Sequence, residues 1–361
     1  MGDTESPPVS RVEPAAVGGL ERPARSVEPR AWERRRIIIT AVCTTGGLGL
    51  FAYVVGRAGI NEVVGGIQRV GWGLTAILAL QGLRFAVRTE CWRLCMPRST
   101  HLPFRRAFGA FLAGDAIGNV TPLGLLASEP TKVFLTRHHL ATRDSVASLA
   151  MENLIYAASV AAMVAIGLLI VLATVPLPVA WWWGLVAGLA LVVSAVFRMR
   201  ALIRRPAVTG SRARSRWREQ FERLRVAVAE FSDTHEPRLW AAFGFDAIFH
   251  AVAVVEVFLT LRWLLGDQSP TLTQAVAFEA LNRVVTVAFK FVPFRVGVDE
   301  AVTGAAAPLL AVDPAAAVAL AVVRKVRNLF WSFVGLAVIV AHPAEAVPET
   351  RRRSGEDEPR L

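Results

Sequence analysis

The chain has 361 residues, of which 54% are hydrophobic and 19% are charged, and its formal net charge is +11. Soluble domains carry roughly 25% charged residues, so this composition excludes an ordinary soluble domain and is typical of an integral membrane protein. The positive charge does not indicate a nucleic-acid partner, because the basic residues lie between apolar segments and no nucleic-acid-binding motif interleaves them with aromatic residues.

Polar segments flank a long apolar region. Residues 1–36 are rich in proline and residues 342–361 are equally polar, so both are predicted to be disordered tails, and we expect no cleavable signal peptide. Residues 37–341 are the predicted membrane domain. Arginines 34–36 precede this region and arginines 351–353 follow it, which places both termini in the cytoplasm by the positive-inside rule.

Six apolar segments are long enough to cross a bilayer, which takes about 20 helical residues. They are residues 37–55, 71–87, 145–175, 181–197, 239–265 and 314–341. Residues 56–69 are expected to be an outside loop, and residues 198–238, with eleven arginines against five acids, the basic cytoplasmic loop. The sequence therefore predicts an all-α, multi-pass helix bundle in the cytoplasmic membrane.

Two further apolar stretches, residues 107–127 and 273–310, are interrupted by proline and glycine. Basic clusters flank the first stretch on both sides, so a complete crossing would place one cluster outside. We therefore expect a re-entrant hairpin that turns near residues 120–128, and a second hairpin broken near residues 293–297. Such irregular backbone is tolerated in a membrane only where protein or water shields it.

The two breaks share one spacing. Each has, in order, a proline, a glycine, a small helix-capping residue and a glutamate seven positions after the proline. These residues are Pro122, Gly124, Ser128 and Glu129 in the first break and Pro293, Gly297, Asp299 and Glu300 in the second. Because the charge rule orients the two copies oppositely, residues 70–175 and 239–341 are predicted to form an inverted repeat whose breaks meet near the midplane. The alternative is two chance kinks in a helix bundle.

The residue types at each break predict how the chain turns there. Proline ends the first helix, glycine permits unusual backbone angles, and Ser128 and Asp299 are expected N-caps of the second helix. The free N–H groups at such a helix start attract phosphate. Glu129 and Glu300 could instead simply satisfy the helix ends, and a catalytic pair is a further alternative.

Charged residues also lie inside the last span. Arg324, Lys325 and Arg327 follow its start by ten to thirteen residues, near the bilayer centre, where lipid exposure is too costly. Arg324 and Arg327 share one helix face, which we expect to look onto Asp299 and Glu300. The predicted headgroup site comprises Arg324, Arg327, Asp299, Glu300, Ser128, Glu129, Lys132, Glu152 and Asn119. The alternative is a purely structural network of salt bridges.

These motifs resemble a known family. The run from Gly114 to Gly124, followed by Ser128 to Lys132, is similar to the lysylphosphatidylglycerol synthase transmembrane region, also called the flippase-like family. The run from Pro293 to Glu300, with Arg324 and Arg327, resembles the second signature of that family. The resemblance covers roughly residues 37–341. It implies translocation of a lipid, or a partner role in the assembly of lipids and glycans.

The chain also departs from that family's pattern. Leucines flank Gly124 and Arg295 precedes Gly297, where the family often shows more glycines. About twenty residues follow the last predicted span and contain no soluble aminoacyl-transferase domain, so synthase activity is not expected.

The leading functional hypothesis is a flippase-like protein for an anionic, phosphate-bearing membrane lipid. The alternative is a non-transporting scaffold that presents lipid to an enzyme of envelope biosynthesis. We expect no enzymatic activity, cofactor or metal, because the chain has no P-loop, no G-x-S-x-G and no H-E-x-x-H motif. Cys91 and Cys95 lack nearby paired histidines and are a weak metal site. The sequence leaves the oligomeric state open.

Overall fold

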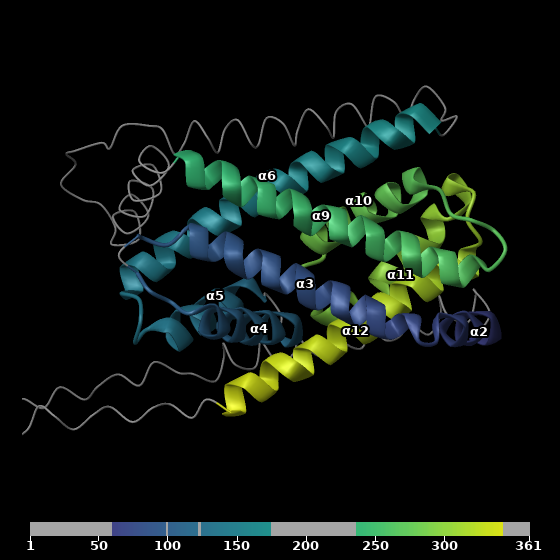
Figure 1. Cartoon of the computed structure of the whole chain (residues 1–361). Coiled ribbons are helices and arrows are strands. Elements are labelled where there is room, and N and C mark those ends of the chain that lie inside the picture. The colour runs from purple at the N-terminus through teal and green to yellow at the C-terminus, as the bar shows by residue number, and fades with distance from the viewer. Residues whose placement is uncertain (1–59, 99, 122–123, 175–235, 342–361) are drawn as a thin grey trace, which may run out of the picture. The chain divides into compact units, whose positions relative to one another are not determined.

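The computed structural model describes residues 60–98, 100–121, 124–174 and 236–341 (Figure 1). The chain divides into two units, residues 1–38 and 39–361, and every described residue belongs to the second. The predicted tails, the predicted spans 37–55 and 181–197, and nearly all of the predicted loop 198–238 lie outside the described residues. Those expectations stay predictions.

The described residues form helices and no strands, which confirms the all-α prediction for this part of the chain. The long helices are α2 (Ile60–Val70), α3 (Gly73–Leu94), α4 (Phe104–Val120), α5 (Leu125–Thr136), α6 (Thr142–Thr174), α9 (Glu236–Leu265), α10 (Leu272–Ala288), α11 (Val298–Ala306) and α12 (Pro314–Ala341). Two short 3-10 helices, η1 (Pro293–Arg295) and η2 (Pro308–Leu310), flank α11.

Two of the described helices are long and apolar enough to cross a membrane, namely α6 and residues 238–265 of α9. They correspond to the predicted spans 145–175 and 239–265. Helices α3 and α12 have 22 and 28 residues, more than the roughly 20 that a span requires. Both helices carry charged residues along their buried faces, which lowers their mean hydropathy.

The prediction of an outside loop at residues 56–69 is wrong in part, because residues 60–70 form helix α2. Its apolar residues recur at helical spacing, and Val70 is buried. The helix packs against α9 and α12, and Arg69 donates from Nη1 to the carbonyl of Leu264 at 2.9 Å. Packing against α9 and α12 therefore makes this segment helical, although its polar and charged residues are typical of a loop.

Helix α3 extends two turns beyond the predicted end of its span at residue 87. Thr89, Cys91 and Trp92 are fully buried, and Trp92 donates from Nε1 to Ser148 on α6 at 3.0 Å. Arg88, the first residue after the predicted span, lies inside the bundle and pairs with the buried Glu152. The length of the helix is set by these distant contacts, which a local apolar pattern does not reveal.

The first interrupted stretch forms two packed helices, α4 and α5, with the break where it was predicted. Thr121, at the end of α4, is extended with ψ 137°, as expected for a residue that precedes proline. A Cβ on Gly114 would lie 2.7 Å from Lys132, so only glycine allows this close approach of α4 and α5. Ser128 is not the N-cap as predicted, because α5 begins one turn earlier, after Gly124.

The second interrupted stretch runs from α10 through η1 to α11. Phe294 and Arg295 have φ angles of 49° and 50°, and Gly297 has 81°. A non-glycine residue in this region costs about 1–2 kcal/mol, so the break is held by its surroundings. Gly297 is the N-cap of α11, which corrects the prediction of Asp299; Asp299 lies in the first turn. Helix α4 contacts η1, so the second break lies against the first hairpin.

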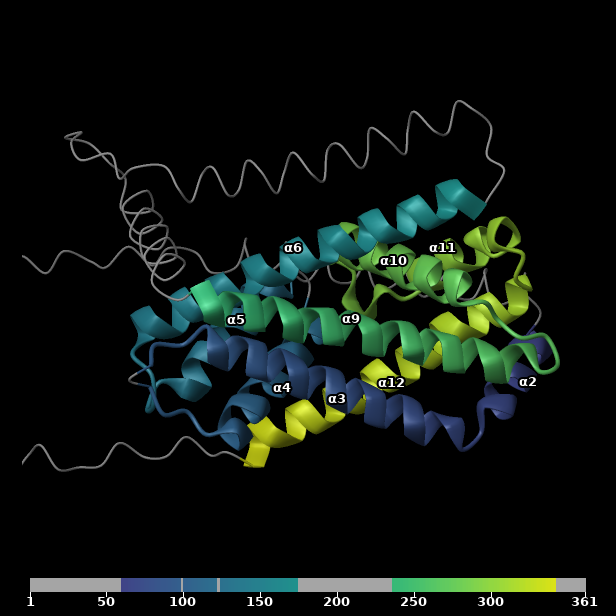
Figure 2. The same cartoon turned by 45° about the horizontal axis from the view of Figure 1, so that its top comes forward.

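Helices α3 and α9 lie side by side along most of their length, and α6 packs against α10 (Figures 1 and 2). One apolar cluster, which includes Ile77, Leu261 and Phe278, fills the space between α3, α9, α10 and α12. Small residues allow the closest helix contacts, as is common in membrane bundles. Gly167 of α6 lies directly against Ala280 of α10, and Gly335 of α12 against the Leu112 carbonyl of α4.

Replacing Gly167 with leucine should destabilise the protein, because any Cβ at this position collides with Ala280. Overpacking of this kind costs about 1–3 kcal/mol. The matched control is Gly244→Leu on α9, where a Cβ would meet nothing within 4 Å. Thermal unfolding in detergent should show a lower midpoint for Gly167→Leu only. Equal midpoints would mean that α6 and α10 are not packed this closely.

Candidate functional site

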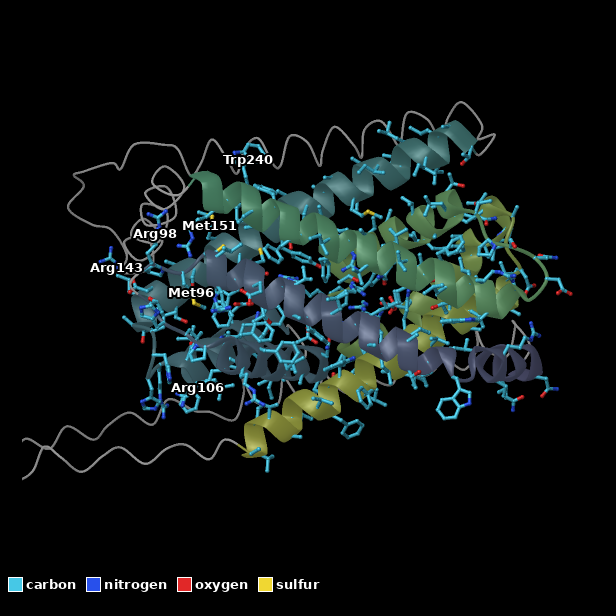
Figure 3. All side chains as sticks on the ribbon, viewed as in Figure 1. Met96, Arg98, Arg106, Arg143, Met151 and Trp240 are labelled. Carbon is cyan, nitrogen blue, oxygen red and sulfur yellow. The ribbon has the colours of Figure 1, made fainter. Side chains whose placement is uncertain are left out.

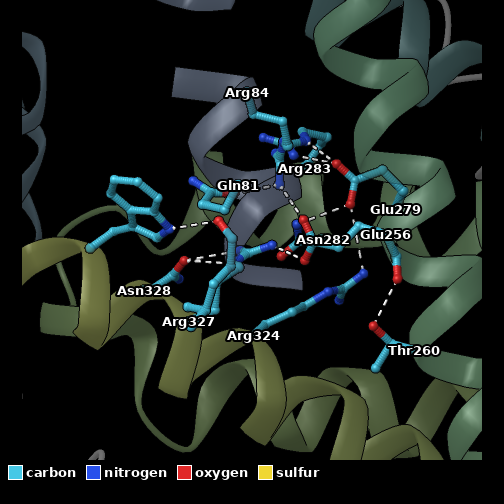
Figure 4. Close-up of polar contacts among 12 residues, drawn as sticks. Gln81, Arg84, Glu256, Thr260, Glu279, Asn282, Arg283, Arg324, Arg327 and Asn328 are labelled. Atoms are coloured by element: carbon cyan, nitrogen blue, oxygen red, sulfur yellow. Dashed lines mark hydrogen bonds and ion pairs between the residues drawn. The ribbon is translucent and has the colours of Figure 1, made fainter. Parts of the chain in front are cut away.

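A buried polar network connects helices α3, α9, α10 and α12 (Figure 4). We call it the arginine network. Its members are Gln81, Arg84, Glu256, Glu279, Asn282, Arg283, Arg324, Arg327 and Asn328. Each of its four arginines is at most 6% exposed. Charges buried to this degree require partners, because removing an ion from water costs several kcal/mol.

Glu256 holds one half of the network. Its carboxylate accepts from Arg84 Nη1 at 3.1 Å through one oxygen and from Arg327 Nη1 through the other. The same Nη1 of Arg84 donates to Gln81 at 2.9 Å. Glu256 is 2% exposed. Because it pairs with both Arg84 and Arg327, its single carboxylate joins α3 and α12 to α9.

Glu279 holds the other half. It accepts from Arg283, one turn along α10, and from Asn282 Nδ2 at 3.3 Å. Arg324 Nη2 of α12 lies 3.6 Å from the second oxygen, close enough for an ion pair but too far for a hydrogen bond. Arg324 is therefore the loosest member of the network.

The network has a surplus of positive charge. It contains four arginines but only two carboxylates, Glu256 and Glu279, which leaves a net charge of +2. Within the described part of the chain, Arg84 Nε and Arg324 Nη2 are buried without a hydrogen-bond acceptor. Such unsatisfied donors are costly, and each of them could donate to a bound anion.

A second group of charges lies on the α6 side. Arg88 donates to Glu152, with Nε at 3.0 Å, and Glu152 is fully buried. The Arg88 guanidinium also stacks 3.7 Å from the centre of the Tyr156 ring. Arg283 donates from Nη1 to the Tyr156 hydroxyl at 3.2 Å, so Tyr156 joins this group to the arginine network.

The polar residues of the first hairpin pair locally. Lys132 contacts Glu129 at 3.1 Å and lies 4.3 Å from the centre of the Phe111 ring, while Asn119 donates to Asp115 at 2.8 Å. Asp115 also interacts electrostatically with Arg88, Lys132 and Arg295. The hairpin charges thus face both the Arg88 group and the second break.

The second break is fastened to α12 by Lys325. Its ammonium donates to the carbonyls of Phe294 at 3.3 Å and Arg295 at 3.1 Å, and it pairs with Glu300 at 2.9 Å. Glu300 also accepts from the backbone N–H of Gly297 at 2.8 Å. This is the contact that the alternative role of Glu300, satisfying its helix end, requires. Asp299 pairs with Arg295 at 3.2 Å.

Residues 37–335 match the sequence model of the family described as Lysylphosphatidylglycerol synthase TM region. The chain belongs to this family. The match covers more than half of the chain and confirms the resemblance seen in the motifs. Membership makes the chain a membrane protein related to lipid handling. No curated protein and no solved structure matches.

The predicted site of this family member is only partly assembled as expected. Arg324 and Arg327 do lie in a buried polar centre, but their acidic partners are Glu279 and Glu256. Their face was expected to look onto Asp299 and Glu300, but those acids form ion pairs with Arg295 and Lys325, and of the two it is Asp299 that interacts electrostatically with Arg324. Neither Ser128 nor Asn119 belongs to the arginine network.

The predicted headgroup site left out six buried charged or histidine residues of the bundle: Arg84, Asp246, His250, Glu256, Glu279 and Arg283. Asp246, His250 and Glu256 stand inside the predicted span 239–265, and Arg84 inside the span 71–87. An ionisable residue in an apolar span is itself a signal of a functional site, and that signal was available in the sequence. Among the described residues, no group of histidine, cysteine and acidic side chains could hold a metal ion.

Proposed function

We propose that this family member is a flippase-like protein of the cytoplasmic membrane that translocates an anionic, phosphate-bearing lipid. The observation that carries the proposal is the surplus charge of +2 in the arginine network, with two buried N–H groups that lack acceptors. Arginine binds phosphate through paired N–H groups and remains charged at every physiological pH.

Arg324 is the proposed primary ligand of the headgroup. It has the weakest internal contact of the four arginines, so it can turn to a phosphate without breaking a hydrogen-bonded pair. Arg84 would supply its free Nε from the opposite side, on α3. The network is enclosed in this conformation, so entry of the headgroup requires its surrounding helices to separate.

Transport then follows from alternating exposure. The network would open toward one leaflet, admit the headgroup, close, and open toward the other, while the acyl chains stay in lipid. The two hairpins would be re-entrant and related as an inverted repeat, in line with their matched breaks. Glu129, Lys132 and Glu152 would form a second polar station on the path of the headgroup.

The arrangement of arginines supports the proposed orientation. Arg98, Arg106 and Arg143 project from the end of the bundle where α3 ends and α4 and α6 begin (Figure 3). By the positive-inside rule this end faces the cytoplasm, with six spans in all and both termini on that side. Anionic headgroups of the inner leaflet would gather there before entry.

Reconstitution with labelled lipid tests the proposal. Arg324→Gln should abolish translocation of a fluorescent phosphatidylglycerol in vesicles, and Arg324→Lys should reduce it, because the charge remains but the paired N–H groups do not. The control is Arg262→Gln, a change at an exposed position in the last turn of α9. If Arg324→Gln extracts as a monodisperse protein and moves lipid at the normal rate, the site lies elsewhere.

The enclosure of the network favours one alternative, a scaffold that binds lipid for an envelope enzyme without moving it. Its four arginines are almost inaccessible, as in a purely structural ion network. A scaffold would retain labelled lipid on purification yet leave lipid asymmetry unchanged in vesicles. Neither function includes a catalytic step, a cofactor or a metal.

A further inference from the structure

Three polar side chains meet between α6 and α9, outside the arginine network. Asp246 and His250 stand one turn apart on α9, and both contact Ser159 on α6. The Asp246 Oδ2 lies 3.0 Å from Ser159 Oγ, and His250 Nε2 lies 3.2 Å from the same oxygen. Asp246 is fully buried and His250 is 6% exposed.

Asp246 has no ion-pair partner among the residues that the structure describes, unlike Glu152, Glu256, Glu279 and Glu300, the other fully buried carboxylates of the bundle. Its Oδ1, like Nδ1 of His250, is buried without a hydrogen-bond partner. A lone carboxylate in an apolar interior is very costly in its ionised form and favours the neutral acid.

The single hydrogen of the Ser159 hydroxyl has two oxygen acceptors, besides His250 Nε2 in the tautomer in which that nitrogen carries no hydrogen. It can be donated to Asp246 Oδ2 at 3.0 Å or to the carbonyl of Tyr156 at 2.9 Å. If Asp246 is protonated, its O–H donates to Ser159 Oγ, and Ser159 donates to Tyr156. If Asp246 is ionised, Ser159 must turn and donate to the carboxylate. The hydroxyl therefore adjusts to either protonation state of Asp246.

We propose that Asp246, Ser159 and His250 form a proton-binding site that couples lipid movement to a proton gradient. The inference rests on the proposed function and names its coupling ion. The carboxylate takes one proton from water on one side of the membrane and returns it to water on the other. Only O–H bonds form and break, so no further reactant is required.

The charged and titratable groups that face this site come from three packed helices. They are Arg84, Arg88 and Cys91 on α3, Glu152 and Tyr156 on α6, and Glu279 and Arg283 on α10. Arg88 is decisive among them, because it interacts electrostatically with Asp246 while it is paired with Glu152. Glu152 is thus the competitor of Asp246 for one guanidinium.

Coupling follows from that competition. With Asp246 neutral, Arg88 stays with Glu152 and stacks on Tyr156, which holds α3 against α6. With Asp246 ionised, a second carboxylate attracts the same guanidinium toward α9. Because Tyr156 also accepts from Arg283, a displacement of Arg88 reaches the arginine network through one residue.

Two measurements on the purified full chain test the proposal. Infrared difference spectra between acidic and alkaline buffers should show a protonated carboxyl band that is lost in Asp246→Asn and retained in Glu90→Gln, a control on α3 whose side chain is about one-third exposed, at 33%. In vesicles, an imposed proton gradient should change the rate of phosphatidylglycerol translocation at least several-fold for the wild type. Asp246→Asn should still move lipid without a gradient but should lose the response.

Each outcome decides one of the two proposals. If the wild type moves lipid at a rate that ignores the gradient, or Asp246→Asn keeps the full response, the coupling proposal fails and the lipid function stands. If the wild type moves no lipid, the proposed function fails, and the infrared band alone decides whether Asp246 binds a proton. Should Asp246→Asn not fold, Ser159→Ala must shift the pH at which the band disappears; an unchanged band would overturn the site.

Discussion

Replacing Glu256 with glutamine is expected to prevent most of the protein from reaching its folded state. The change leaves three arginines of the network without a balancing charge, since Glu279 is the one carboxylate that remains in it. Removing one partner of a buried ion pair costs about 3–5 kcal/mol, and here one carboxylate serves Arg84 and Arg327 together. The yield of monodisperse protein after detergent extraction, and its thermal midpoint, measure the effect.

A matched control separates burial from charge. Glu90 also pairs with an arginine, Arg93, but both side chains are about one-third exposed, at 33% and 34%. Glu90→Gln should change stability by no more than about 1 kcal/mol. The double variant Glu256→Gln with Arg327→Gln should recover part of the lost yield, because it removes one unpaired cation. If the single variant is as stable as the wild type, Glu256 does not anchor the network.

Replacing Glu300 with alanine is expected to open the second break. Two contacts vanish together, the 2.9 Å pair with Lys325 and the 2.8 Å hydrogen bond from the Gly297 backbone. The positive φ angles of Phe294 and Arg295 depend on this anchorage, because Lys325 also holds their carbonyls. Hydrogen exchange of residues 290–300, followed by mass spectrometry, should accelerate at least tenfold.

The neighbouring acid provides the comparison. Asp299 lies in the same turn, but its ion pair is with Arg295 inside the break itself, and no hydrogen bond or ion pair joins it to α12 among the described residues. Asp299→Ala should accelerate exchange far less than Glu300→Ala. Equal acceleration in both variants would show that Lys325 does not hold the break.

The positions of the two breaks could be predicted from sequence because their causes are local. Proline and glycine together favour an interruption of a helix, so the breaks between α4 and α5 and between α10 and α11 were expected within a few residues of where they occur, although α5 runs nine residues past the predicted end of its stretch. The extension of α3 to Leu94 could not be predicted, since it depends on the burial of Trp92 against Ser148 on another helix. The same holds for α2, which is ordered by α9 and α12.

For the candidate site as well, features with a local cause could be predicted and features set by distant contacts could not. An arginine near the centre of a span must be buried, and this cost argument located Arg324 and Arg327 correctly. Which acid each arginine meets depends on how distant helices are rotated, and chain order wrongly favoured Asp299 and Glu300. The actual partner of Arg327 is Glu256, 71 residues away. No local pattern encodes that pairing.

The ion pairs of the bundle join some of its helices and not others. They join α3 to α6 and α9, and α12 to α9 and α10, so separating any of these helices pulls opposite charges apart in an apolar medium. Among the described residues, the first hairpin has one ion pair, and both of its partners lie in α5. Helix α4 packs against α12 at Gly335, which has no side chain. A displacement of the first hairpin along α12 would therefore break no ion pair between described residues. Opening the arginine network between α3, α9, α10 and α12 is the costlier motion, because it does separate ion pairs.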